Sequence, residues 1–173
     1  MNRWNEAFSE KGNEKGAEMI AARDTFLKVY ARFIREIVAQ DISKQLEVNQ
    51  EAIVHQSKPI FRVVYPGQMA TGTRHCDADY CHQPNEVNVW IPLTVVYSTN
   101  SLWVESRPGK ANYRPIESRS GEAFRFYGNQ CEHFTCANTT EHTRVSFDLR
   151  VVPQKLHDPS YREKVGKGAG LQS

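Results

Sequence analysis

The stretch 74–93, RHCDADYCHQPNEVNVWIPL, decides the fold, and it begins with two candidate metal ligands. His75 and Asp77 are two residues apart. In a β-strand, alternate side chains leave the same face, so a strand here directs the imidazole and the carboxylate to one side. This part of the stretch therefore predicts a strand that brings two ligands to one metal ion.

The second half of the stretch alternates apolar and polar residues, as a half-buried strand does. One face carries Val87, Val89, Ile91 and Leu93, and the other carries Glu86, Asn88 and Trp90. We expect the apolar face to pack against a helix, and the other face to line a pocket with Asn88 and Trp90. Trp90 could equally fill the core. Pro92 limits this strand, because proline cannot donate to a ladder.

Two later segments add a third ligand and a candidate anion-binding group. His133 offers another imidazole, and Arg144 and Ser146 are again two residues apart. Two histidines and one carboxylate on one face of a metal, with other positions open, form the ligand set of non-haem Fe(II) oxygenases. Arg144 behind such a set could bind a carboxylate through its planar guanidinium, and Ser146 could add a hydroxyl.

The segment 144–152 has the clearest strand pattern of the chain. Its apolar residues are Val145, Phe147, Leu149 and Val151, and they alternate with Arg144, Ser146, Asp148 and Arg150. All the polar groups thus share one face. We expect this face to point toward the metal position, and Pro153 to end the strand.

Five short motifs follow one another along the chain: His75-x-Asp77, Asn88-x-Trp90-Ile91-Pro92-Leu93, Asn100-Ser101-Leu102-Trp103-Val104, Gly128-Asn129-Gln130-Cys131-Glu132-His133 and Thr143-Arg144-Val145-Ser146-Phe147-Asp148. In order and spacing they resemble the Fe(II)/2-oxoglutarate dioxygenases. Within that superfamily the likeness is strongest to the phytanoyl-CoA-hydroxylase-like branch and to oxygenases of aminoglycoside-antibiotic, streptomycin-type pathways. HxD alone is a weak motif, whereas HxD with a distal histidine and RxS is fairly specific.

The resemblance implies a mainly β protein with the double-stranded β-helix, or jelly-roll, fold. It implies a hydroxylase of a small polar metabolite that uses Fe(II) as cofactor and 2-oxoglutarate as co-substrate. The residues that it implies for Fe(II) are His75, Asp77 and His133, and those for the oxo acid or substrate are Arg144, Ser146, Asn88 and Trp90. A carboxylate at Asp77 argues against the halogenating relatives, in which a small residue at this position admits chloride.

Other ligand sets stay open at this point. Asp79 would share a strand face with Asp77 and could replace it as the carboxylate ligand. A cupin, which is also a jelly roll but needs no oxo acid, would use His75, His82, Glu86 and His133. It would act as a dioxygenase, an isomerase or a small-ligand binder. A metal-free jelly-roll module would line its pocket with Trp90, Tyr127 and Arg62.

Outside these motifs the strongest pattern is a long helix over residues 15–41. Its apolar residues recur every three or four positions and form one stripe, which we expect to pack on the outer face of a sheet. Residues 42–56 fit a short helix followed by a strand and stay open. Further short strands are expected over 60–65, 102–106, 113–117 and 123–127, a pattern typical of a β-sandwich or barrel.

A chain of 173 residues is expected to form one domain. We place this domain at residues 15–153, after a flexible amino terminus at 1–14 and before a tail at 154–173 that is mobile or acts as a lid. Many relatives carry further helices over the mouth of the barrel. A homodimer could therefore supply a wall that this chain lacks.

Charge and hydropathy narrow the choice of partners. The net charge is +2, from 22 basic and 20 acidic residues, so there is no broad basic field for a nucleic acid. Neither a signal peptide nor a run of about 18 apolar residues occurs. We therefore expect a cytoplasmic protein with a small-molecule substrate and no membrane contact.

The cysteines form two pairs of equal spacing, Cys76 with Cys81 and Cys131 with Cys136. Such symmetry is compatible with a zinc clamp, although four intervening residues lie at the permissive edge of zinc-site spacing. A strand would place Cys76 on the face opposite His75, as a small buried group. We expect core or loop thiols in preference to zinc ligands. A disulfide is disfavoured in the cytosol.

Overall fold

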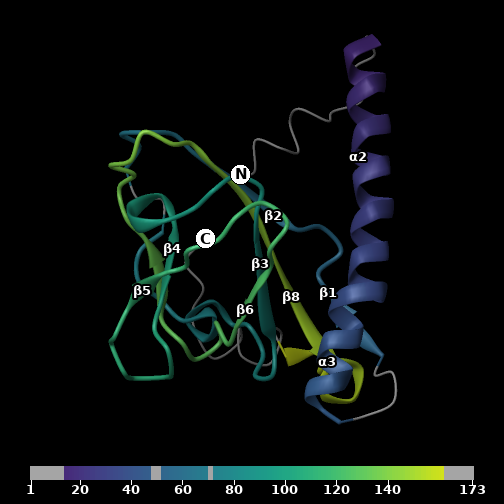
Figure 1. Ribbon diagram of the computed structural model, residues 1–173. Helices are drawn as coiled ribbons and strands as arrows, with labels where there is room; N and C mark the ends of the chain where they lie inside the picture. The colour runs from purple at the N-terminus through teal and green to yellow at the C-terminus, as the bar shows by residue number, and fades with distance from the viewer. Residues whose placement is uncertain (1–13, 48–51, 70–71, 162–173) are drawn as a thin grey trace. The chain divides into compact units, whose positions relative to one another are not determined.

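The computed structural model describes residues 14–47, 52–69 and 72–161 of the chain. It divides into two compact units, Met1–Ala52 and Ile53–Ser173. The first unit contains the long helix, and every strand of the described residues belongs to the second (Figure 1). None of the helices within the described ranges has the length and apolar character needed to cross a membrane.

The helical unit is one continuous helix with a short π-helical section. The α-helix α2 covers Glu14–Phe33, the π-helix η1 covers Ile34–Val38, and α3 covers Ala39–Gln45. Its buried apolar residues are four apart and so form one stripe: Tyr30, Ile34, Val38 and Ile42. The predicted helix is thus confirmed and continues to residue 45. Its packing on a sheet stays a prediction.

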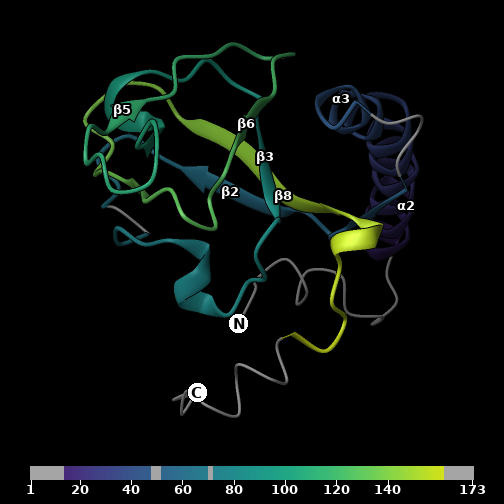
Figure 2. The same cartoon turned by 90° about the horizontal axis from the view of Figure 1, so that it is seen from below.

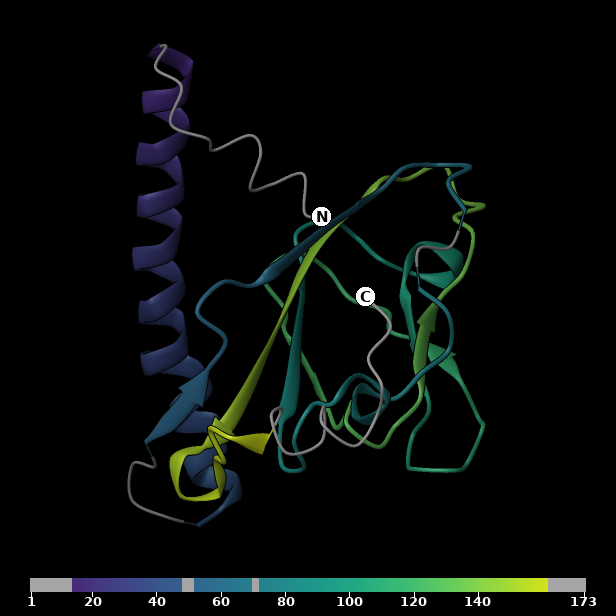
Figure 3. The ribbon, with the colours of Figure 1, turned by 180° about the vertical axis from the view of Figure 1, so that it is seen from behind.

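The larger sheet has five antiparallel strands. These are β1 (Ile53–His55), β2 (Ile60–Val64), β3 (Val87–Pro92), β6 (Phe124–Phe126) and β8 (Arg144–Pro153). The long strand β8 lies at the centre, with β1 and β2 on one side and β3 on the other, and β6 follows β3 (Figure 3). This arrangement places the polar face of β8 next to that of β3.

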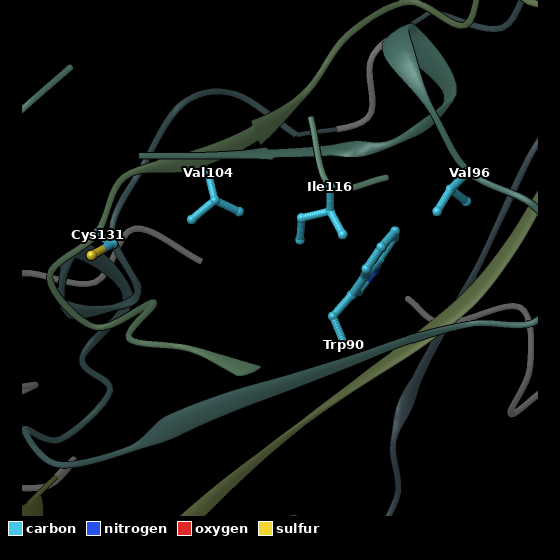
Figure 4. Packing of buried hydrophobic residues seen from close by; sticks show 5 residues of the cluster. All are labelled: Trp90, Val96, Val104, Ile116 and Cys131. Carbon is cyan, nitrogen blue, oxygen red and sulfur yellow. The ribbon is translucent and has the colours of Figure 1, made fainter. Parts of the chain in front are cut away.

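The smaller sheet has the order β5, β4, β7, also antiparallel. Its strands are β5 (Arg114–Pro115), β4 (Leu102–Val104) and β7 (His133–Thr135). The two sheets form separate layers (Figure 2). A hydrophobic cluster lies between them, with Trp90 from β3 facing Ile116 and Val104 (Figure 4). The mainly β architecture with a long amino-terminal helix is therefore confirmed.

One predicted strand is wrong. His75 forms only an isolated bridge with His133, and Asp77–Tyr80 is a 3-10 helix, η2. The Asp79 carboxylate accepts a hydrogen bond of 2.9 Å from the Cys76 amide, which caps the turn. Cys81 then takes a left-handed conformation with φ of 60°. Local side-chain hydrogen bonds of this kind compete with strand formation in short polar segments.

The other predicted strands exist with shorter bounds, apart from 144–152, which gains one residue as β8. The strand predicted at 113–117 keeps only two residues, as β5. Strand β7 was not predicted, and β1 lies in the segment that the sequence left open. The predicted flexible region 1–14, apart from residue 14, and the tail from 162 onward lie outside the described residues.

The cysteines are free thiols. Cys81 and Cys131 are buried, and Cys76 and Cys136 are half-buried. None of them belongs to a group of potential metal ligands in the described part of the chain. The preferred prediction of core or loop thiols is thus consistent with the structure.

Candidate metal centre

The structure brings the three predicted ligands together. One ligand atom from each of His75, Asp77 and His133 lies within 4.8 Å of the others. Asp77 Oδ1 is 3.6 Å from His133 Nε2 and 4.0 Å from His75 Nε2. Among the described residues this is the only group of three or more histidine, cysteine or acidic side chains that could hold a metal ion.

Backbone pairing holds the two histidines side by side. The His133 amide donates to the His75 carbonyl at 2.9 Å, and the His75 amide donates back at 3.2 Å. Their ring centroids are 4.5 Å apart. The site therefore depends on a reciprocal bridge between two segments far apart in sequence, and not on a strand through residue 75.

Hydrogen bonds at Nδ1 orient both imidazoles. His75 Nδ1 lies 2.6 Å from the Thr73 carbonyl, and His133 Nδ1 lies 3.1 Å from the Cys131 carbonyl. Because a carbonyl can only accept, each Nδ1–H is the donor, and the neutral ring keeps its lone pair on Nε2. Burial lowers the pKa of His133, which favours this neutral form. Both Nε2 atoms are thus ready to bind a cation.

The Asp77 carboxylate is buried and strongly bound by the protein. Arg150 donates Nε to Oδ2 at 2.7 Å and Nη2 to Oδ1 at 2.8 Å, and Asn88 donates Nδ2 to Oδ2 at 2.7 Å. Burial alone acts to raise the pKa of Asp77, but the Arg150 and Asn88 contacts lower it to about 2. The carboxylate is therefore ionised at neutral pH.

These groups open into a cavity of about 490 Å³ between the sheets. Its lining includes the three ligands together with Asn88, Trp90, Arg144, Asp148 and Arg150. Three of the four polar residues of β8, Arg144, Asp148 and Arg150, therefore line the cavity as predicted, whereas Ser146 is not part of its lining. Trp90 fulfils both of its predicted roles, since it lines the cavity and belongs to the hydrophobic cluster.

Arg144 lies in this cavity with most of its guanidinium unpaired. The residue is only 1% exposed. Its Nη1 donates to the Asn100 carbonyl at 3.2 Å, but Nε and Nη2 have no hydrogen-bond partner among the described residues. Burial lowers the pKa of Arg144 to about 10, so it still carries its charge at neutral pH. Buried unpaired donors are costly, and an anion would satisfy them.

Two buried hydroxyls share this property. Ser146 Oγ and Thr135 Oγ1 are buried without a partner in the described structure. Ser146 follows Arg144 on the same strand face, and Thr135 lines the cavity two residues after His133. Arg62 also lines the cavity, where it pairs with Asp148 at 3.3 Å while its side chain stays 42% exposed.

The alternative ligand sets are not assembled. Asp79 caps the turn before η2 and is absent from the ligand group. His82 Nδ1 instead contacts Glu86 at 2.8 Å, so the four cupin positions do not converge. Tyr127 lines a different cavity from Trp90 and Arg62. Asp79, His82 and Glu86 are therefore not part of the candidate metal group, and Tyr127 does not join Trp90 and Arg62 in one cavity.

Strand alternation placed Arg150 on the face that points toward the metal position, but the sequence assigned it no contact. Thr135 was not predicted to line the cavity, because the three residues of β7 are too few to show alternation. The described part of the tail, including His157, lines another cavity of about 320 Å³ and not the metal cavity.

Comparison with known proteins gives one relative by sequence and several by fold. No family model matches the chain. The chain is 32% identical over 145 residues to the streptomycin biosynthesis protein StrG of Streptomyces griseus. This match covers 84% of the chain but only 65% of StrG, so the chain spans less than two thirds of that relative.

Solved structures share the fold at low identity. The non-haem monooxygenase ThoJ, in its nickel complex, has a TM-score of 0.53 and 13% identity, over 67% of this chain and 49% of ThoJ. The chain has the fold of a non-haem monooxygenase. AviO1 from Streptomyces viridochromogenes Tue57 matches with a TM-score of 0.52 and 13% identity, over 88% of this chain and 66% of AviO1. The predicted resemblance to a streptomycin-pathway protein is thus confirmed by sequence, and the likeness to the non-haem oxygenases is confirmed at the level of the fold.

Proposed function

We propose that this protein is an Fe(II)- and 2-oxoglutarate-dependent oxygenase that hydroxylates a small polar metabolite. The observation that carries the proposal is the pairing, in one cavity, of a three-ligand group with a buried and largely unpaired arginine. We further propose that the two sheets are those of a double-stranded β-helix.

The donor set fits ferrous iron. Two neutral imidazole nitrogens and one carboxylate oxygen are the ligands of the facial sites that bind non-haem Fe(II). His75, His133 and Asp77 would hold the ion, and their outer hydrogen bonds already orient them. Because these three side chains line the cavity, an ion held by them would have room beside it for a co-substrate.

The unpaired groups fit the distal carboxylate of an oxo acid. Arg144 can offer Nε and Nη2 as a fork to one carboxylate, and Ser146 and Thr135 can add hydroxyls. Bound Fe(II), 2-oxoglutarate and dioxygen supply the oxidising power to insert oxygen into a C–H bond. The chain's own part is to bind the oxo acid, orient the substrate carbon and exclude water.

The rest of the cavity suggests the substrate's character. Aromatic side chains, Tyr80, Trp90, Phe126 and Phe134, line it beside the polar Thr73 and His82. Such a mixture suits a compact molecule with both apolar faces and hydrogen-bonding groups. The similarity to StrG supports a metabolite of an antibiotic pathway.

Anaerobic titration tests this proposal. Wild-type protein with Fe(II) and 2-oxoglutarate is expected to show the weak visible charge-transfer band of the iron–oxo-acid chelate. In Arg144→Met, the 2-oxoglutarate concentration needed for the band should rise about 10- to 100-fold, because charge-assisted hydrogen bonds are lost. Arg114→Met, which removes an exposed arginine outside the cavity, is the matched control.

Three results would overturn parts of the proposal. Wild-type protein that binds no Fe(II) would show that this is a metal-free binding module. Iron binding without the band would show that 2-oxoglutarate does not bind to the iron, and the protein would then be a different kind of metalloenzyme. An unchanged band in Arg144→Met would assign the oxo acid to other residues.

A further inference from the structure

The Asp77 carboxylate is held from two neighbouring strands. Arg150 on β8 binds both oxygens, Oδ2 through Nε at 2.7 Å and Oδ1 through Nη2 at 2.8 Å. Asn88 on β3 donates to Oδ2 at 2.7 Å. Asn88 and Arg150 are direct cross-strand partners, so their side chains leave the same face of the sheet. Asn88 and Arg150 therefore form a clamp that holds the Asp77 carboxylate of η2.

This clamp treats the two carboxylate oxygens differently. Oδ2 accepts two side-chain N–H groups, from Arg150 and Asn88. Oδ1 accepts one and is the oxygen that faces the imidazoles, 3.6 Å and 4.0 Å from their Nε2 atoms. The carboxylate cannot rotate without breaking these bonds. The arrangement thus selects Oδ1 as the atom available to a metal.

Gly128 contributes to the same clamp. A Cβ at this position would lie 2.7 Å from the amide group of Asn88, a distance that excludes any side chain without movement of Asn88. The Gly128 carbonyl also accepts the Asp77 amide at 2.8 Å. The backbone at Gly128 therefore fixes both Asp77 and one of the groups that orient it.

We propose that Arg150 and Asn88 are positioning residues that aim Asp77 Oδ1 at the metal, which rests on the proposed function of this site. Arg150 does not touch the oxo acid or the substrate in this role. Its part is distinct from that of Arg144, which has free donors for a ligand. Arg150 acts through Asp77 alone, and it prepares the ligand geometry before the ion arrives.

Two effects of Arg150 on metal binding have opposite signs. Its positive charge repels a divalent cation, so loss of the charge alone would strengthen metal binding. Its hydrogen bonds orient the ligand, so loss of the fork would weaken binding, typically by about 10- to 100-fold. The direction of change in an Arg150 variant therefore separates a positioning role from a charge effect.

Anaerobic Co(II) titration, followed by visible absorption, gives the test. We expect Arg150→Met to bind Co(II) about 10- to 100-fold more weakly than wild type. Arg150→Lys keeps the charge but lacks the fork, so it should also bind more weakly and show an altered cobalt spectrum. Arg62→Met is the matched control, because Arg62 lines the same cavity but pairs with Asp148. Its Co(II) affinity should stay close to wild type.

Asn88→Ala is a second variant that still tests the inference if the Arg150 variants do not fold. It removes one of the two donors to Oδ2, so its Co(II) affinity should fall less than that of Arg150→Met. Tighter or unchanged Co(II) binding in both Arg150→Lys and Asn88→Ala would overturn this inference and leave the proposed function intact. Wild-type protein without Co(II) binding would overturn both.

Discussion

Two arginines of β8 that face the same cavity have opposite surroundings. Arg150 uses Nε and Nη2 to bind Asp77, whereas the same two atoms of Arg144 have no partner in the described structure. The Arg150 side chain is 13% exposed, and Arg144 as a residue is 1% exposed. At the metal end of the cavity, Asp77 is thus the counter-ion of Arg150. At the anion end, Arg144 requires an anion from outside the protein.

The comparison shows how one strand face can serve two tasks. The internal pair of Asp77 and Arg150 fixes the carboxylate geometry, because a buried pair joined by two hydrogen bonds has few alternative arrangements. The unpaired Arg144 keeps its hydrogen-bonding capacity for a ligand. The cost of burying it unpaired is recovered when an anion binds. A preorganised metal end and an incomplete anion end match the roles proposed for Arg150 and Arg144.

The largest effect on the metal end is expected from Asp77→Ala. This change removes the acidic ligand, so metal affinity should fall by more than the roughly 100-fold typical of losing an outer hydrogen-bonding partner. Asp79→Ala is the matched control, since that carboxylate only accepts the Cys76 amide. It should retain Co(II) binding and lose about 1 kcal/mol of stability as a lost cap. Loss of cobalt in Asp79→Ala would make Asp79 the ligand.

The next largest effect is expected in the stability of metal-free variants, where the loss of Arg150 and the loss of Arg144 can be compared directly. Arg150→Met leaves the buried Asp77 charge without its partner, and should lower the free energy of unfolding by about 3–5 kcal/mol. Arg144→Met removes a buried charge that is mostly unpaired, so its change should stay within about 1 kcal/mol. Urea denaturation measures both. Equal losses would mean that the two ends of the cavity do not differ.

The pH dependence of stability should reveal the Asp77 pair. The folded pKa of Asp77 is about 2, below its ordinary value of 3.8, so the pair stabilises the fold above pH 3.8. This stability is lost as the pH falls through about 2. The contribution is on the order of 2–3 kcal/mol. Urea denaturation of the metal-free wild type and of Asp77→Asn, from pH 5 to pH 2, should show a steeper loss of unfolding free energy in wild type. Parallel curves would show that the Asp77–Arg150 pair does not stabilise the fold.

Strand alternation made part of this site predictable. The period of two is a local property, so the shared face of Arg144 and Ser146 and the inward face of β3 followed from the sequence alone. The candidate metal ligands were predicted for a partly mistaken reason. His75 and Asp77 converge through a 3-10 helix and a backbone bridge to His133, and such long-range hydrogen bonds leave no trace in residue spacing.

The role of Arg150 could not be predicted in the same way. Its contact with Asp77 joins residues 73 positions apart, and it depends on where the turn at η2 meets the sheet. Strand β7 was missed because three residues are too few to show alternation. The sequence therefore located the cavity face, while the pairing inside the cavity required the tertiary structure.

The smallest effect is expected at Thr135, which sharpens the contrast at the anion end. Thr135→Val removes a buried hydroxyl that has no partner among the described residues, so stability should stay equal or rise by up to about 1 kcal/mol. The oxo acid should bind a few-fold more weakly, about 3- to 10-fold, if the hydroxyl binds its carboxylate. Thr139→Val is the matched control, because its hydroxyl contacts Thr99 at 2.8 Å. It should lose a little stability and keep the oxo-acid affinity. Unchanged oxo-acid affinity in Thr135→Val would restrict the anion site to Arg144 and Ser146, since a hydroxyl that gains no partner on binding contributes nothing to affinity.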